Sequence, residues 1–186
     1  KQAIDKADAV LIIPILRHGG SSPNPNNSKK LKTSTPATLD TIIVRQYRPP
    51  MQAYTLEFPA GLIDKDETPE KAALRELYEE TGYIGEQIIP ASSPLLCMTP
   101  GLTDESVHMI LVNVDLNDSR NVNPKQHLDA GENVEIKRIP LVGGLKEMLD
   151  QQQGGKGGDG GFTGVPISML YTFALGVEMG MNMGAN

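Results

Sequence analysis

The sequence predicts an α/β fold, with a mixed β-sheet sandwiched between α-helices. Several short runs rich in Val, Ile, Thr and Tyr are typical of strands. They surround segments that carry helix start and stop signals, which places the helices on the faces of a sheet. The 186 residues are enough for one domain, and contents of 39% hydrophobic and 22% charged residues are typical of a globular protein.

Local patterns predict the strands in order along the chain. Residues 9–16 form a short apolar run, and Pro14 within it favours an edge strand or a bulge. Residues 41–47 are rich in β-branched side chains and precede a pair of prolines, and residues 54–58 form the next strand. Further strands are expected at residues 95–98, 107–114 and 135–141. Cys97 falls in the first of these three and is expected to lie in the core.

The sequence marks both ends of one helix. Thr68 is a good N-cap, Pro69 suits the first helical position, and Glu70 favours the positive end of the helix. Gly82 supplies a left-handed stop, so the helix is expected over residues 69–81. Two more helices are expected at residues 145–153 and 165–183.

Two segments and the chain start complete the predicted organisation. Residues 18–40 are rich in Gly, Ser, Pro, Asn, Thr and Lys and predict a flexible loop insertion. Residues 153–161 predict a glycine-rich linker before the C-terminal helix. Because residue 1 is Lys and no signal-peptide pattern follows, we expect these residues to be part of a longer chain.

Composition narrows the function classes. The net charge of −6 makes a nucleic-acid partner unexpected, and no apolar run is as long as a membrane span, so no membrane partner is expected. A single cysteine allows neither an internal disulfide framework nor a Cys-rich zinc site, which favours a reducing, cytoplasmic compartment. The acids are concentrated between Glu57 and Glu80, where eight acids stand against three bases.

Three of these acids share one face of the helix at residues 69–81. Glu76, Glu79 and Glu80 are spaced three and four apart, which places the Cβ atoms of each such pair roughly 5–6 Å from each other. Arg75 and Glu79 are also four apart and are expected to form an ion pair. The helical spacing by itself fits two interpretations, a solvated acidic face and a site for a hard divalent cation.

A longer pattern favours the cation site. Residues 61–83 read Gly-x5-Glu-x7-Arg-Glu-Leu-x-Glu-Glu-x-Gly-Tyr, which resembles the Nudix box at every charged and glycine position. The one departure is Tyr83, at a packing position that is usually aliphatic. The resemblance extends to the eukaryotic ADP-ribose pyrophosphatases of this family at residues 44–50 (VRQYRPP), 57–64 (EFPAGLID) and 97–103 (CMTPGLT).

The resemblance implies a Nudix fold and a Mg²⁺-dependent pyrophosphatase, with Mn²⁺ as a possible substitute, that hydrolyses ADP-ribose to AMP and ribose 5-phosphate. Two alternatives remain open: a broader pyrophosphatase of ADP-sugars or oxidised nucleoside diphosphates, and a catalytically dead nucleotide-sensing module. Family members usually begin with a further N-terminal sheet that helps to form a homodimer. That sheet has no counterpart in these 186 residues, although a homodimer is still expected.

The resemblance also assigns roles to single residues. It implies metal binding by the Ala60 carbonyl, Glu76 and Glu80, with Glu79 sharing a metal and a catalytic role. It implies that Glu132 orients or deprotonates the attacking water, with Glu135 as the competing candidate. The residues that it places at the substrate are Arg48, Glu57, Leu62 and Thr99, the last at a position where relatives can carry an aspartate.

Overall fold

The computed structural model describes residues 9–18, 39–87, 95–152 and 161–183. Its longer strands are β1 (Ala9–Arg17), β2 (Leu39–Arg48), β3 (Ala53–Glu57), β7 (Ser106–Asp115) and β8 (Val134–Pro140). Short strands are β4 (Ala60–Leu62), β5 (Glu86–Gln87), β6 (Leu96–Cys97) and β9 (Val165–Pro166). The helices are α1 (Pro69–Thr81), α2 (Gly144–Gln151) and α3 (Ser168–Met183), with 3₁₀ turns η1 (Pro49–Met51) and η2 (Ser119–Asn121).

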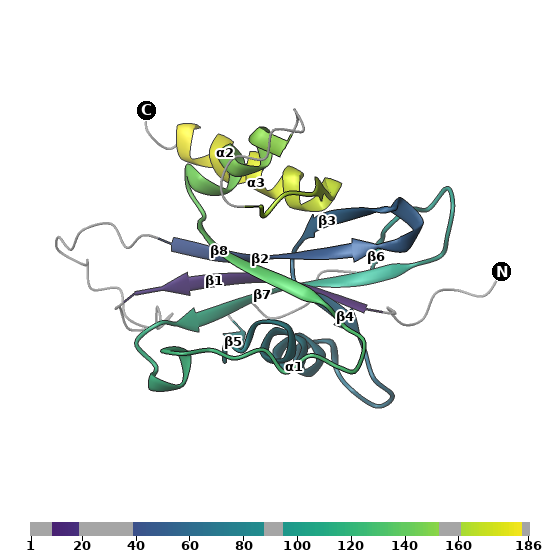
Figure 1. Cartoon of the computed structure of the whole chain (residues 1–186), viewed down its shortest axis with the longest axis horizontal. Helices are drawn as coiled ribbons and strands as arrows, with labels where there is room; N and C mark the ends of the chain where they lie inside the picture. The colour runs from purple at the N-terminus through teal and green to yellow at the C-terminus, as the bar shows by residue number, and fades with distance from the viewer. Residues whose placement is uncertain (1–8, 19–38, 88–94, 153–160, 184–186) are drawn as a thin grey trace.

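The strands form one mixed sheet that lies between helices (Figure 1). Its main order is β5-β7-β1-β2-β3-β9, with β4 paired to β1, β6 to β7 and β8 to β2. β1 runs parallel to β7 and antiparallel to β2. α1 covers one face of the sheet, and α2 and α3 cover the other (Figure 1). The structure confirms the predicted α/β sandwich.

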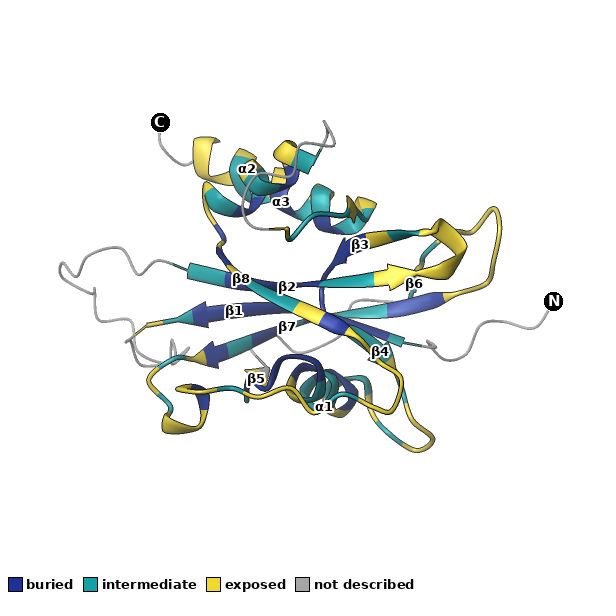
Figure 2. Cartoon of the chain, in the orientation of Figure 1, coloured by how far each residue is buried: buried dark blue, intermediate teal, exposed yellow. Residues whose placement is uncertain are grey.

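β1 is buried on both faces, which explains why its sequence is a continuous apolar run rather than an alternating one. Leu11, Ile13 and Ile15 join the core on the side of α2 and α3. Val10 and Ile12 join the core on the side of α1, together with Leu16. The burial is deepest along this central strand and fades toward the rim of the sheet (Figure 2).

Pro14 does not mark an edge strand, so that expectation was wrong. β1 pairs with β7 along its whole length, from Ala9 opposite Val107 to Arg17 opposite Asp115. On its other side, β1 pairs with β4 over Ala9–Leu11 and with β2 at Leu16 and Arg17. Pro14 lies between these two registers, and its carbonyl accepts a hydrogen bond of 2.8 Å from Thr41 Oγ1. Pro14 has no N–H to donate, but it lies where β1 changes its partner from β4 to β2. The missing hydrogen bond is therefore tolerated inside the sheet.

α1 begins and ends at the residues that the sequence predicts. The Thr68 side chain accepts a hydrogen bond from Lys71 N, and Pro69 is the first helical residue. Gly82 has a φ of 74° and donates its N–H to Tyr78 O at 2.8 Å. Leu77 and the neighbouring alanines are buried against β1 and β7, so the acidic side of α1 lies away from the core.

Other boundaries needed correction. Leu39 and Asp40 belong to β2, so the predicted loop of residues 18–40 ends earlier, and residues 19–38 lie outside the described residues. The predicted linker lies outside them as well, except for Gly161. Cys97 is exposed rather than in the core, because β6 is a two-residue strand at the rim of the sheet. Within the described part of the chain, none of the helices has the length and apolar character needed to cross a bilayer.

Candidate active site

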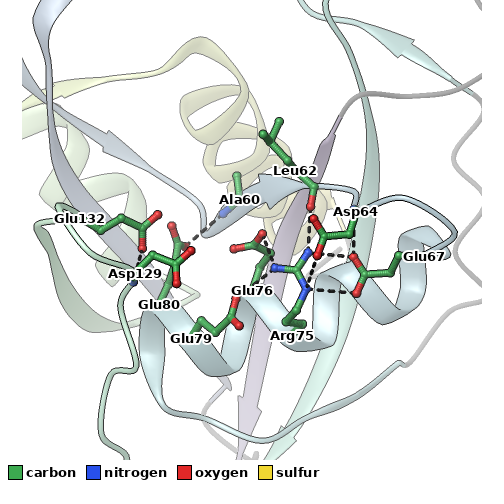
Figure 3. Close-up of polar contacts among 10 residues, drawn as sticks. All are labelled: Ala60, Leu62, Asp64, Glu67, Arg75, Glu76, Glu79, Glu80, Asp129 and Glu132. Atoms are coloured by element: carbon green, nitrogen blue, oxygen red, sulfur yellow. Dashed lines mark hydrogen bonds and ion pairs between the residues drawn. The ribbon is translucent and has the colours of Figure 1, made fainter.

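An acidic groove of about 340 Å³ opens between α1, β4 and the loop that precedes β8. Three segments meet there although they are far apart in sequence (Figure 3). Five of the nine lining residues are acids. The lining consists of Ala60, Gly61, Leu62, Asp64, Arg75, Glu76, Glu79, Asp129 and Glu132.

Glu76 lies directly against the backbone of β4. A Cβ built on Gly61 would overlap the Glu76 carboxylate, so only glycine leaves room for that carboxylate at this place. The Glu76 side chain is 14% exposed, and its Oε1 accepts a 2.7 Å hydrogen bond from Arg75 Nη1. Burial raises the pKa of Glu76 above its usual value, and the carboxylates of Glu79 and Glu132 add to this rise while Arg75 opposes it.

We expect Gly61→Ala to weaken Mg²⁺ binding by about tenfold or more, because the new methyl group displaces the Glu76 carboxylate. The φ of Gly61 is not positive, so alanine is compatible with the backbone and the fold should persist. The matched control is Gly176→Ala, where the added Cβ meets open space. Magnesium titrations followed by calorimetry check this expectation. Equal Mg²⁺ affinities for the two variants would show that the Gly61–Glu76 contact does not contribute to metal binding.

Glu80 lies one helical turn from Glu76 and is more deeply buried, with 6% of its surface exposed. Its Oε2 accepts a 3.2 Å hydrogen bond from the N–H of Ala60, which joins α1 to the start of β4. The pKa of Glu80 is raised to about 8, chiefly by burial and also by the carboxylates of Glu76, Glu132 and Glu57, against the opposing hydrogen bond from Ala60. An ionised Glu80 is therefore disfavoured until a cation compensates its charge.

This raised pKa predicts how the stability of the metal-free protein depends on pH. In the unfolded chain Glu80 ionises near 4.5, whereas in the native state its pKa is about 8. Between these values the native state binds more protons, so the free energy of unfolding falls as pH rises through this window, by on the order of 5 kcal/mol in total. Thermal unfolding in a chelator, measured from about pH 5 to about pH 9, should show a falling Tm. The same series on Glu80→Gln should be flatter, and equal slopes would contradict the assignment.

Arg75 connects the parts of the groove. Its Nη2 donates to Glu67 Oε2 at 2.8 Å and to Leu62 O at 2.9 Å, and its Nη1 donates to Glu76 and, at 3.0 Å, to Glu79. The predicted ion pair of Arg75 and Glu79 is confirmed. The hydrogen bonds from Arg75 lower the pKa of Glu67, and the same carboxylates raise the pKa of Arg75. One guanidinium thus holds the loop after β4 against two turns of α1 (Figure 3).

Arg48 and Glu57, both predicted at the substrate, bind each other. Nε and Nη2 of Arg48 donate to the two carboxylate oxygens of Glu57 at 2.8 and 2.7 Å, a bidentate pair at the ends of β2 and β3. Burial by itself favours a neutral Glu57, but hydrogen bonds from Arg48 and Thr55 lower the pKa of Glu57 below its usual value. Glu80 is close enough to help raise the pKa of Arg48, so this pair lies near the buried end of the acidic face.

The structure separates the two candidates for the catalytic loop acid. Glu132 lines the groove, and its carboxylate accepts a 3.1 Å hydrogen bond from Asp129 N (Figure 3). Glu135 lies on β8 opposite Arg45 and forms an ion pair with it. Arg45 in turn stacks on Tyr54, with its guanidinium carbon 3.5 Å from the ring centroid. Glu135 therefore belongs to a different surface.

Of the other predicted site residues, some line the groove and others do not. Ala60, Leu62, Glu76 and Glu79 line the groove. Thr99 does not line it, because it caps an exposed turn in which its hydroxyl lies 3.0 Å from that of Thr103. Sequence reasoning assigned no role to Asp64 or Asp129, which also line the groove. The sequence signal at each was an acid close to a glycine, Asp64 inside the box and Asp129 after it, which is too common a pattern to single them out.

The groove suits a hard divalent cation. All of its candidate ligands are oxygens, namely carboxylates and the Ala60 carbonyl, which is the donor type that Mg²⁺ prefers. Burial and like charge raise the pKa values of Glu76 and Glu80, and a cation would relieve that cost. Across the described ranges, no three carboxylate, imidazole or thiol side chains already converge as metal ligands. Two reasons are visible, since Arg75 holds Glu76 and the Ala60 N–H holds Glu80.

Sequence comparison finds relatives of this chain that are named as pyrophosphatases or Nudix hydrolases. An "ADP-sugar pyrophosphatase" of Mus musculus is 42% identical over 137 residues, which are 72% of this chain and 53% of the relative. An uncharacterized Nudix hydrolase of Schizosaccharomyces pombe is 38% identical over 74% of this chain and 62% of its own length. An "ADP-ribose pyrophosphatase" of Saccharomyces cerevisiae is 39% identical over 61% of this chain and 49% of its own length.

These relatives are longer than the chain, which spans about half of their length. The family model of the NUDIX domain matches residues 38–152. That match includes β4, α1 and the loop before β8, which line the acidic groove. The chain therefore belongs to the Nudix hydrolase family.

Proposed function

We propose that this chain carries the catalytic groove of a Mg²⁺-dependent pyrophosphatase that hydrolyses ADP-ribose to AMP and ribose 5-phosphate. The observation that carries the proposal is an acidic groove lined by Glu76, Glu79 and Glu132, beside a buried Glu80 whose charge is opposed by the carboxylates of Glu76 and Glu132. Members of this family generally depend on a divalent metal ion. The printed names of three relatives, from mouse, Saccharomyces cerevisiae and Bacillus subtilis, support an ADP-sugar or ADP-ribose substrate.

Glu76, Glu80 and the Ala60 carbonyl are the proposed metal ligands, with Glu79 shared between metal and catalysis. Bound metal would polarise the pyrophosphate and lower the pKa of a coordinated water. Arg75 bonds to both Glu76 and Glu79, so a bound metal would compete with its guanidinium for the Glu76 carboxylate.

Glu132 is the proposed base for the attacking water. It comes from the loop before β8 rather than from α1, so it faces the groove from a different element than the proposed metal ligands (Figure 3). Arg48 is the proposed phosphate contact. Glu57 occupies its Nε and Nη2, which leaves Nη1 for a phosphate oxygen and holds the guanidinium in one orientation.

Leu62 is exposed at the rim of the groove and is proposed to pack against the substrate. Thr99 remains a proposed substrate contact only through a movement of its turn or through a longer substrate. A homodimer, Mn²⁺ substitution and a cytoplasmic location also remain proposals. The mass of the full-length protein in solution, measured by light scattering, tests the first of these.

Product analysis tests the substrate assignment. The full-length protein is incubated with ADP-ribose, a second ADP-sugar and an oxidised nucleoside diphosphate, each with Mg²⁺, with Mn²⁺ and with a chelator. AMP released from ADP-ribose, and abolished by the chelator, is the expected result. Equal turnover of both ADP-sugars would favour the broader pyrophosphatase, an alternative that the name of the mouse relative supports. Tight binding of ADP-ribose without turnover would favour a sensing module.

A further inference from the structure

The segment between η2 and β8 crosses the C-terminal end of α1. The last carbonyls of a helix have no partner within it and need donors from elsewhere. Here Glu79 O accepts a 2.7 Å hydrogen bond from His127 N, and Glu80 O accepts one of 2.7 Å from the side-chain amide of Gln126. The helix that carries the acidic face is thus capped by a segment 46 residues further along the chain.

Gln126 makes a second contact, which closes the catalytic loop at its base. Its Nε2 also donates to Val134 O at 2.9 Å. An amide nitrogen carries two hydrogens, so the two hydrogen bonds use its whole donor capacity. Val134 is the first residue of β8 and follows Glu132 by two positions. One side chain therefore joins the backbone of Glu80 to the end of the loop that carries Glu132.

Neighbouring contacts keep the segment close to the helix. A Cβ built on Gly82 would overlap the backbone of Lys125, so the two chains approach as closely as glycine allows. The rings of Tyr78 and His127 stack with centroids 4.5 Å apart and an interplanar angle of 21°. Both contacts fix the start of the loop on α1, but Gln126 is the residue that also reaches β8.

We infer that Gln126 is a positioning residue, which holds Glu132 in register with the carboxylates of α1. The inference rests on the proposed function, in which Glu132 accepts a proton from water. The two 3.1 Å hydrogen bonds between Glu132 and Asp129 lie within the loop, so they shape it without placing it on α1. The base of the loop is what places it on α1, because Gln126 bonds there to the backbone of Glu80, whose carboxylate is a proposed metal ligand.

Two substitutions distinguish the effect of the hydrogen-bond donors of Gln126 from the effect of its side-chain size. Gln126→Met keeps the length and removes both donors, whereas Gln126→Lys adds one methylene and supplies three donors beside a helix C-terminus that favours a cation. We expect Gln126→Met to lower kcat by about 10–100-fold, with KM for ADP-ribose and the Mg²⁺ dependence within about twofold of wild type. Gln126→Lys should recover most of kcat. Gln151→Met, an exposed glutamine on α2, is the matched control.

Amide hydrogen exchange gives a readout that does not need turnover. In Gln126→Met the amides of residues 128–133 should exchange faster, while those of residues 72–78 in α1 keep their protection. If wild type hydrolyses ADP-ribose, an unchanged kcat in Gln126→Met overturns the inference. Uniformly faster exchange with a lower Tm also overturns it, because the role would then be structural. If wild type is inactive, the proposed function fails, and selective exchange in residues 128–133 alone decides whether Gln126 places the loop.

Discussion

Glu80→Gln should lower kcat by roughly a thousandfold while leaving the protein folded. The substitution removes the negative charge from the most deeply buried carboxylate of α1, so Mg²⁺ binding and charge stabilisation in the transition state should both be lost. The glutamine oxygen can still accept the hydrogen bond from Ala60 N. Because no charge is buried in the variant, its metal-free form should unfold at a higher temperature than wild type at about pH 8 or above.

Rates at saturating Mg²⁺ and Tm in a chelator measure the two effects separately. The matched control is Glu70→Gln, which changes the same chemical group in the first turn of α1, outside the groove. Glu70→Gln should stay within about twofold of the wild-type rate. Near-wild-type turnover of Glu80→Gln would remove Glu80 from the metal site, and a lower Tm in the chelator would show that its carboxylate stabilises the fold instead.

Glu132→Gln should lower kcat by about 10²–10⁴-fold, the usual effect of removing a general base. The affinity for Mg²⁺ should change little, since Glu132 lies on a loop across the groove from the proposed ligands on α1. The amide can keep the hydrogen bond from Asp129 N, so the loop conformation should persist. Single-turnover rates and magnesium titrations on the same sample distinguish the effect on chemistry from the effect on binding.

Glu135→Gln is the control for Glu132→Gln, because the two residues compete for one role in the sequence. Glu135 pairs with Arg45 on the neighbouring strand, so its loss should cost little activity and at most a small decrease in Tm. If Glu135→Gln were the slow variant and Glu132→Gln the fast one, the assignment of the loop acid would be reversed.

Local signals made α1 predictable to the residue, whereas the short strands depend on distant partners. Thr68, Pro69 and Gly82 specify the helix ends through their own side chains and backbone. β4 exists because Ala60–Leu62 meets β1, fifty residues away, and no feature of the three residues themselves predicts that pairing. The exposure of Cys97 has the same origin, since it depends on β6 being a two-residue strand that pairs with the start of β7.

The candidate site shows the same division. Glu76, Glu79 and Glu80 share a helix face, so their spacing alone predicts that they lie together. The choice between Glu132 and Glu135 required the register of β8 on β2, which places Glu135 opposite Arg45. The sequence does not single out Gln126, because its two hydrogen-bond acceptors, Glu80 O and Val134 O, belong to α1 and β8. These contacts form only when the chain folds.

The parallel pairing of β1 with β7 has a consequence for synthesis of the chain. Ala9 pairs with Val107, so the centre of the sheet has a high contact order and β1 waits for its partner while the intervening segments are made. Until then an apolar strand with high β-propensity is exposed to other nascent chains. Pro14 interrupts that strand at the one stretch where the finished sheet tolerates it, and so acts as a gatekeeper against aggregation.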